Sequence, residues 1–225
     1  MFAYGPAVAL AALPRRDDRS REHLDNTARH ARPVVLAGER VLAVPGPLGA
    51  RLPGGGLRRG TVVAVDGDPG AGATGIAFEL AAAATAAGEW AAAVELDAGL
   101  GGLAAGEAGV ELDRFAVVRR VPPARWAAVV AALLEGISVV LAEVPAYART
   151  GDARRLLARA RERGAVLVAM GSWPAEAALR LRAAGAEWRG LGPGEGVLAR
   201  GDRRVHVDGR GVAPRERFTA LARAG

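Results

Sequence analysis

Short apolar stretches alternate with longer, helix-like stretches through the middle of the chain. Five stretches are β-branched or continuously apolar, as in strands buried in a sheet: residues 61–65, 91–96, 115–118, 137–142 and 165–170. Four stretches between them are Ala-rich or amphipathic, as in helices: residues 74–87, 101–108, 122–135 and 151–163. Strands that alternate with helices of this length form βαβ units. The pattern therefore predicts an α/β fold with a mainly parallel sheet flanked by helices.

The pattern is less regular toward both ends of the chain. Residues 34–44 favour extended segments, and the Gly- and Pro-rich residues 45–60 favour a flexible loop. Residues 175–184 suit either a helix, by propensity, or a strand in which Leu179 and Leu181 point inward. Both alternatives stay open from the sequence.

A C-terminal β-hairpin is predicted after a turn-rich stretch at residues 188–196. Its strands would be residues 197–200 and 203–208, with Gly201 and Asp202 in the turn. We divide the chain into three parts: an N-terminal extension of residues 1–45, a core domain of residues 46–210, and a tail of residues 211–225. The tail would form a short docking helix or remain disordered.

Composition narrows the chemistry that the chain can perform. The 225 residues carry a net charge of +6, and every basic side chain is arginine, because the sequence contains no lysine. The absence of cysteine excludes disulfides and thiolate metal sites, and no histidine stands in a metal-ligand pattern, so no metal site is expected. Residues 1–14 lack the basic segment of a signal peptide, and no apolar run approaches the ~20 residues of a membrane span. We expect a cytoplasmic protein without membrane contact.

A glycine-rich turn separates the first strong strand from the first strong helix. Gly67, Gly70 and Gly72, followed by Ala73 and Thr74, fit the phosphate-binding template G-x-x-x-x-G-K-[ST] in all but one position. Such glycines let backbone N–H groups approach a phosphate, and the helix N-terminus adds a favourable dipole. Thr74 stands where a hydroxyl would bind Mg²⁺.

The exception is Ala73, which replaces the lysine. That ammonium neutralises the terminal phosphates during phosphoryl transfer, and losing one well-placed electrostatic group commonly costs ~10²–10³ in rate. With no lysine elsewhere in the chain, the motif predicts a vestigial P-loop. We therefore expect no catalytic residues and no cofactor, with ATP and Mg²⁺ as the ligands to test.

Several weak motifs occur in the order found in the RecA family. Residues 54–74 are similar to that family's approach to its P-loop, and residues 92–100 to its second strand, with Asp97 near the catalytic glutamate. Residues 108–113 match a short LGVDID-like segment, and residues 139–143 resemble the Walker B strand, with Glu143 in place of aspartate. The resemblance covers about residues 46–210 and implies a RecA-like P-loop core.

The departures from the RecA family all weaken ATP chemistry or DNA binding. The P-loop lysine is replaced by Ala73, and the longer carboxylate of Glu143 would displace Mg²⁺. Gly171 and Ser172 replace a polar sensor pair, and the two segments that correspond to DNA-binding loops are short. The chain thus resembles a degenerate member of the family.

The C-terminal pattern consists of residues 188–192, 203–205 and 209–211. With the size of the chain, it looks like the ImuA-prime type of actinobacterial mutasome accessory protein. That resemblance implies a non-catalytic scaffold in SOS-response translesion synthesis and DNA repair, located near the nucleoid. The implied partners are an inactive Y-family polymerase homologue of the ImuB type and, through it, an error-prone replicative-type polymerase. Contact with DNA would be indirect.

Aromatic and apolar residues near loops are candidate partner-binding anchors, since tryptophan is enriched at interface hot spots. These residues are Trp173, Trp188, Phe218 and Leu221. Trp126 lies on an apolar helical stripe and is expected in the core. The arginines of residues 151–163 would form a solvated helix face or contact DNA phosphates.

Two other functions stay open beside the scaffold. One is a weak RecA-like ATPase or ATP-binding switch that borrows an arginine or a partner's lysine. The other is a regulatory binder resembling the SulA-type cell-division inhibitors, whose target would be the division GTPase.

Overall fold

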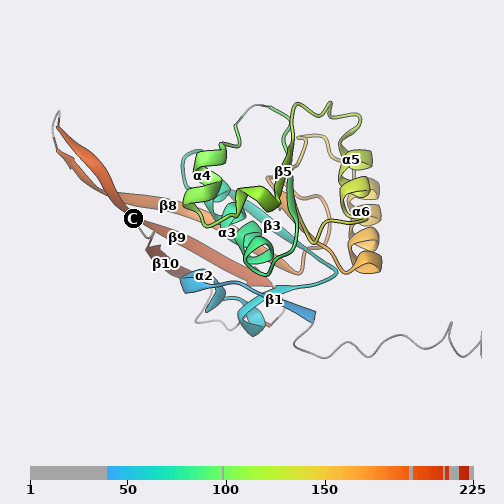
Figure 1. Cartoon of the computed structure of the whole chain (residues 1–225), viewed down its shortest axis with the longest axis horizontal. Coiled ribbons are helices and arrows are strands. Elements are labelled where there is room, and N and C mark those ends of the chain that lie inside the picture. Colours follow the sequence, from blue (N-terminus) through green and yellow to red (C-terminus); the bar gives the residue numbers. More distant parts are fainter. Residues whose placement is uncertain (1–39, 98, 193–194, 210, 213–217, 223–225) are drawn as a thin grey trace, which may run out of the picture. The chain divides into compact units, whose positions relative to one another are not determined.

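The computed structural model describes residues 40–97, 99–192, 195–209, 211–212 and 218–222 (Figure 1). By its internal contacts the chain divides at residue 37, and the description concerns the second unit, Ala37–Gly225. Predictions for residues 1–39 lie outside the described residues. No helix within the described part is long and apolar enough to cross a membrane.

One eight-stranded sheet organises the unit, in the order β10-β9-β8-β3-β7-β6-β4-β5. Its strands are β3 (Thr61–Gly67), β4 (Ala91–Val94), β5 (Phe115–Val118), β6 (Val139–Glu143), β7 (Val166–Met170), β8 (Leu179–Gly192), β9 (Glu195–Gly209) and β10 (Phe218–Ala222). All neighbours from β8 to β5 pair in parallel, whereas β9 runs antiparallel to both β8 and β10. The prediction of an α/β fold with a mainly parallel sheet is confirmed.

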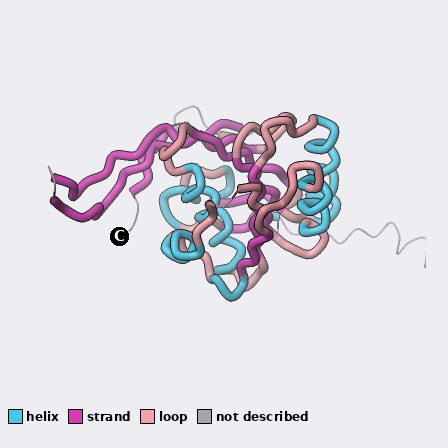
Figure 2. The backbone as a smooth tube through the Cα atoms, turned by 90° about the horizontal axis from the view of Figure 1, so that it is seen from above, coloured by secondary structure: helices cyan, strands magenta, loops and turns pink. Residues whose placement is uncertain are grey.

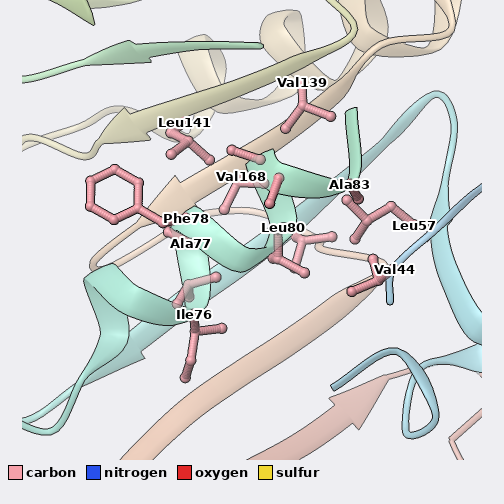
Figure 3. Close-up of a cluster of buried hydrophobic side chains, with 14 of the residues drawn as sticks. Val44, Leu57, Ile76, Ala77, Phe78, Leu80, Ala83, Val139, Leu141 and Val168 are labelled. Atoms are coloured by element: carbon pink, nitrogen blue, oxygen red, sulfur yellow. The ribbon is translucent and has the colours of Figure 1, made fainter. Parts of the chain in front are cut away.

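Helices cover both faces of the parallel strands. One face packs against α3 (Ala73–Ala86) and α4 (Gly102–Glu107), and the other against α5 (Trp126–Leu133) and α6 (Thr150–Arg163). Along β6, Leu141 faces α3 while Val140 faces the opposite layer, and both are fully buried (Figure 3). Burial on both faces explains why these strands are continuously apolar.

Small and aromatic side chains fill the two layers. The buried face of α3 is largely alanine, which lets the helix approach the sheet closely, and Phe78 packs edge-to-face on Phe115 with ring centroids 6.1 Å apart. Trp126 is 2% exposed, so its prediction as a core residue is confirmed.

The flexible loop predicted for residues 45–60 is wrong. This stretch forms α2 (Gly46–Gly49), a 3-10 turn at Pro53–Gly55, and β2 (Gly56–Arg58), which pairs with β1 (Val41–Ala43). Leu48 and Leu57 are buried, and a Cβ on Gly49 would lie 1.6 Å from the Val44 oxygen. The glycine therefore permits close packing rather than flexibility.

The C-terminal strand pair exists, but its predicted boundaries are wrong. Residues 175–184 include the start of a strand, as in the second alternative, with Leu181 fully buried. β8 continues into the predicted turn-rich stretch as far as Gly192. Both predicted hairpin strands lie within β9, and Gly201, predicted in the turn, lies inside β9 opposite Trp188. Figures 1 and 2 show β8 and β9 extending beyond β3 as a ribbon. The docking helix predicted for the tail is also wrong, because Phe218–Ala222 forms β10.

Candidate functional site

A cavity of about 530 Å³ opens at the carboxyl ends of the parallel strands. Its lining residues are Val65, Asp66, Gly67, Ala73, Glu143, Met170, Gly171, Ser172 and Arg182. Here β3 leads to α3 on one face of the sheet, while β6 leads to α6 on the other. Open α/β sheets bind ligands where connections leave for opposite faces. We call this space the carboxyl-edge cavity.

The glycine-rich loop of residues 67–72 borders this cavity through its first residue, Gly67, and through Ala73, which follows it. The Ala71 N–H donates to the backbone oxygen of Asp68 at 3.0 Å, which closes a tight turn. Gly70 and Gly72 have φ of 80° and 93°, a region that favours glycine, and Gly72 is the N-cap of α3. Ala73 is thus the first helical residue and lines the cavity, with no charge to offer an anion.

Two loop glycines have packing reasons of their own. A Cβ on Gly67 would lie 2.7 Å from the Ala183 oxygen, where β3 and β8 pair closely. A Cβ on Gly72 would lie 2.7 Å from Cδ of Arg203, and one on Gly75 only 2.5 Å from its Nη1. Gly67 and Gly72 are therefore required by the fold, independently of any phosphate.

Arginines from β8 and β9 surround the loop, although sequence inspection found neither. Arg182 is the cavity's basic residue, and its Nη1 and Nη2 lie 3.5 and 3.3 Å from Oδ1 of Asp66 and Asp68. Arg203 is 6% exposed, donates to the Gly72 oxygen at 3.4 Å and forms an ion pair with Glu79. Arg203 does not line the cavity.

The predicted carboxylates are placed differently from one another. Glu143 lines the cavity, and its Oε2 accepts a hydrogen bond from the Leu96 N–H at 2.7 Å. Asp97 is exposed and lies outside the lining. Sequence reasoning missed Glu95, which is fully buried and accepts from the Leu100 N–H at 3.2 Å and from Arg119 at 3.3 Å. The sequence signal that could have found Glu95 is a charged residue directly after the apolar strand residues 91–94.

The structure thus brings together only part of the predicted P-loop set. Gly67, Ala73 and Glu143 line the cavity, whereas Gly70, Gly72, Thr74 and Asp97 do not. Among the described residues, no group of three or more His, Asp or Glu side chains could hold a metal ion.

The predicted partner-binding residues lie in different places. Trp173 is 4% exposed, and its Nε1 donates to the Glu176 oxygen at 3.2 Å, so it is a core residue rather than an exposed anchor. Trp188 lies in β8, and Phe218 and Leu221 lie in β10 opposite His206 and Arg203. The side chains of these three are outside the described part.

Sequence comparison identifies a family but no curated relative. No curated protein matches the chain. The model of the MT3502 N-terminal domain family matches residues 50–175, a span that begins just after α2, runs through β7, includes the glycine-rich loop and Glu143, and ends before Arg182. Because the match covers more than half of the 225 residues, the chain belongs to the MT3502 N-terminal domain family.

Proposed function

We propose that this chain is a non-catalytic scaffold on a RecA-like P-loop core, which binds an inactive Y-family polymerase homologue in DNA-damage-induced mutagenesis. The observation that supports it most is electrostatic. The carboxyl-edge cavity is lined by Asp66, Glu143 and a single arginine, Arg182, which already faces Asp66 and Asp68. Among the described residues, a triphosphate would meet two carboxylates and no cation without an acidic neighbour.

This arrangement opposes phosphoryl transfer. Catalysis of that reaction depends on cations that neutralise charge developing on the terminal phosphate. Ala73 supplies none, and Arg203, which does not line the cavity, is held by Glu79 and the Gly72 oxygen. Moving Arg203 to a phosphate would leave Glu79 without its partner, so the borrowed-arginine alternative has an energetic cost.

The partner in this proposal comes from the resemblance to mutasome accessory proteins. The motifs of the broader RecA resemblance fall on β2, β3, β4 and β6 and on the connections beside them, and the C-terminal pattern falls on β8 and β9. A scaffold needs the fold and its surfaces but not the reactive groups, and the two packing glycines preserve the fold after the lysine is gone.

Nucleotide chemistry is tested with the purified full chain. We expect no ATP turnover and no saturable Mg–ATP binding by titration calorimetry up to millimolar concentration. Ala73→Lys is the gain-of-function variant and Ala73→Met its uncharged control of similar length. Turnover by the wild type that Thr74→Ala abolishes would contradict the proposal.

Partner binding is tested by co-expression with the Y-family polymerase homologue. We expect the two proteins to co-purify through size-exclusion chromatography without nucleotide, and added ATP to leave the complex unchanged. Failure of the homologue to co-purify from DNA-damaged cells as well as from co-expression would refute the scaffold role.

An ATP-binding switch is the second candidate, and one observation favours it. The glycine-rich loop still opens on a cavity of about 530 Å³ beside a helix N-terminus. Equilibrium binding of a fluorescent ATP analogue, with and without the partner, separates the two functions. Binding that appears only with the partner would favour the switch.

A further inference from the structure

A second cavity, of about 550 Å³, lies at the opposite edge of the sheet, where β3 and β8 begin. Its walls come from the β1–β2 pair, the 3-10 turn, the second half of α6 and the start of β8. Val41, Pro53, Leu157 and Leu179 make much of the lining apolar. Ligand pockets usually measure ~300–1,000 Å³, so this amino-edge cavity has the size of a binding site.

Backbone hydrogen bonds hold the walls of the amino-edge cavity in place. The Gly60 N–H donates to the Ala165 oxygen at 3.0 Å, and the Ala178 N–H donates to the Val62 oxygen at 2.8 Å. The buried indole of Trp173 donates to the backbone oxygen of Glu176 and so fixes residues 176–179, which form one wall. The cavity is therefore formed before any partner binds, which lowers the entropic cost of binding.

Basic side chains dominate the polar part of the lining. Three arginines, Arg58, Arg59 and Arg161, line the cavity against one acid, Glu176. Glu89 binds Arg59 at 2.5 and 3.1 Å. Arg58 and Arg161 are exposed, and neither has a carboxylate within 4.0 Å among the described residues. Two guanidinium groups thus remain available beside an apolar floor.

The position of α6 limits the kind of anion that fits. Arg161 lies in the last turn of α6, where the helix dipole places partial negative charge. This field disfavours a multiply charged phosphate, and no described α-helix begins at the cavity to offset it. A single carboxylate, paired with a guanidinium in bidentate geometry, avoids most of this repulsion.

We propose that the amino-edge cavity binds an extended peptide segment of a partner protein, with an acidic side chain at Arg58 and Arg161 and a neighbouring aliphatic side chain on the apolar floor. This inference rests on the proposed scaffold function and names the surface and the peptide chemistry that the scaffold uses. Arginine is enriched at interface hot spots, where binding removes it from water.

Peptide selection tests the site without knowledge of the partner's sequence. Phage-displayed 12-residue peptides are selected on the full chain, and enriched peptides are synthesised and titrated by fluorescence polarisation. We expect an acidic residue next to Leu, Ile or Val, and at least tenfold weaker binding to the variant Arg58→Glu/Arg161→Glu. Arg154→Glu, an exposed position on the same helix, should bind like the wild type.

Two results of the selection would overturn the site: enriched peptides without an acid, or peptides that bind the double variant as tightly as the wild type. Failure to enrich any peptide also counts against it. Far-UV circular dichroism and melting temperatures show whether each variant folds. Light scattering detects self-association, and a dimer lost in the double variant, without peptide binding, would identify a second copy as the occupant and refute the proposal.

Co-purification with the Y-family polymerase homologue separates this inference from the proposed function. If wild type and double variant both retain the homologue, the scaffold function stands and the amino-edge site is wrong. If only the wild type and Arg154→Glu retain it, both are supported. If the wild type fails to retain it, the scaffold function is wrong, and peptide titrations alone judge the cavity.

Discussion

The two edges of the parallel sheet use their arginines in opposite ways. At the carboxyl edge, Arg182 faces Asp66 and Asp68, and Arg203 pairs with Glu79 beneath the glycine-rich loop. At the amino edge, two of the three arginines that line the cavity have no acidic partner within the described part.

This difference separates structural charge from charge available for binding. The Arg203–Glu79 pair is largely buried on the arginine side, and breaking it would leave an uncompensated charge, so its members are fixed by the fold. The pairs of Arg182 with Asp66 and Asp68 are exposed and contribute little to stability. Exposed, unpaired guanidinium groups cost the fold little and remain free to meet an anion. Arg203 is therefore not available to an anionic ligand at the carboxyl edge, and Arg182 would meet one only beside Asp66 and Asp68.

Removal of the Glu79 carboxylate should have the largest effect on the carboxyl edge. Arg203 is 6% exposed and its Nε has no partner, so Glu79→Ala would leave a buried cation with only the Gly72 oxygen. We expect a loss of about 3 kcal/mol in the free energy of unfolding, measured by urea denaturation.

Two variants control this measurement. Glu162→Ala removes an exposed partner of Arg159 and should cost less than about 1 kcal/mol. The pair Glu79→Leu/Arg203→Leu removes both charges and should recover most of the lost stability. If Glu79→Ala costs no more than Glu162→Ala, the Arg203 pair is not a structural element and the contrast between the edges fails.

The central fold could be predicted because its signals are local. Strands such as β6 and β7 are buried on both faces, which forces a continuous apolar run, and α3 is marked by alanine content. The error at residues 45–60 arose because glycine and proline outweighed Leu48, Leu52 and Leu57, which are buried. Composition indicated flexibility where tertiary packing requires compact turns.

The candidate site could be predicted only in part, for a different reason. Its loop, Ala73 and Glu143 follow strand ends and are visible in the sequence. Arg203 lies 131 residues from Gly72, and Arg182 lies 114 from Asp68, so no local pattern links them. They depend on the position of β8 and β9 beside β3, which the predicted short hairpin did not provide.

Substitution of the loop glycines should have the next largest effect. Gly67→Ala would place a Cβ 2.7 Å from the Ala183 oxygen and 2.8 Å from its Cβ, so β3 and β8 must separate. We expect a loss of about 2 kcal/mol by urea denaturation in the absence of any ligand. Gly99→Ala, on the same edge with no atom within 4 Å, should stay within about 0.5 kcal/mol of the wild type. Equal stability of both variants would mean that Gly67 is not needed for packing.

The smallest effect is expected at the amino edge, where Glu89 holds Arg59. The hydrogen bond from Arg59 lowers the pKa of Glu89 below its ordinary value of 4.5. The unfolded chain therefore takes up this proton at a higher pH than the folded chain does, so acid favours unfolding. The stabilisation from the pair is complete above about pH 5 and disappears as the pH falls from 4.5 through the lower folded pKa.

Because both side chains are partly exposed, the pair should contribute less than about 1 kcal/mol. A double-mutant cycle with Arg59→Met and Glu89→Gln, measured by urea unfolding at pH 7 and pH 3.5, should give a larger coupling energy at pH 7. Glu89→Gln also frees a third arginine in the amino-edge cavity, so acidic peptides should bind it about two- to threefold more tightly than the wild type at pH 7. If Glu89→Gln binds acidic peptides more weakly than the wild type, Glu89 orients Arg59 for the ligand. The three arginines of this edge would then not act as independent charges.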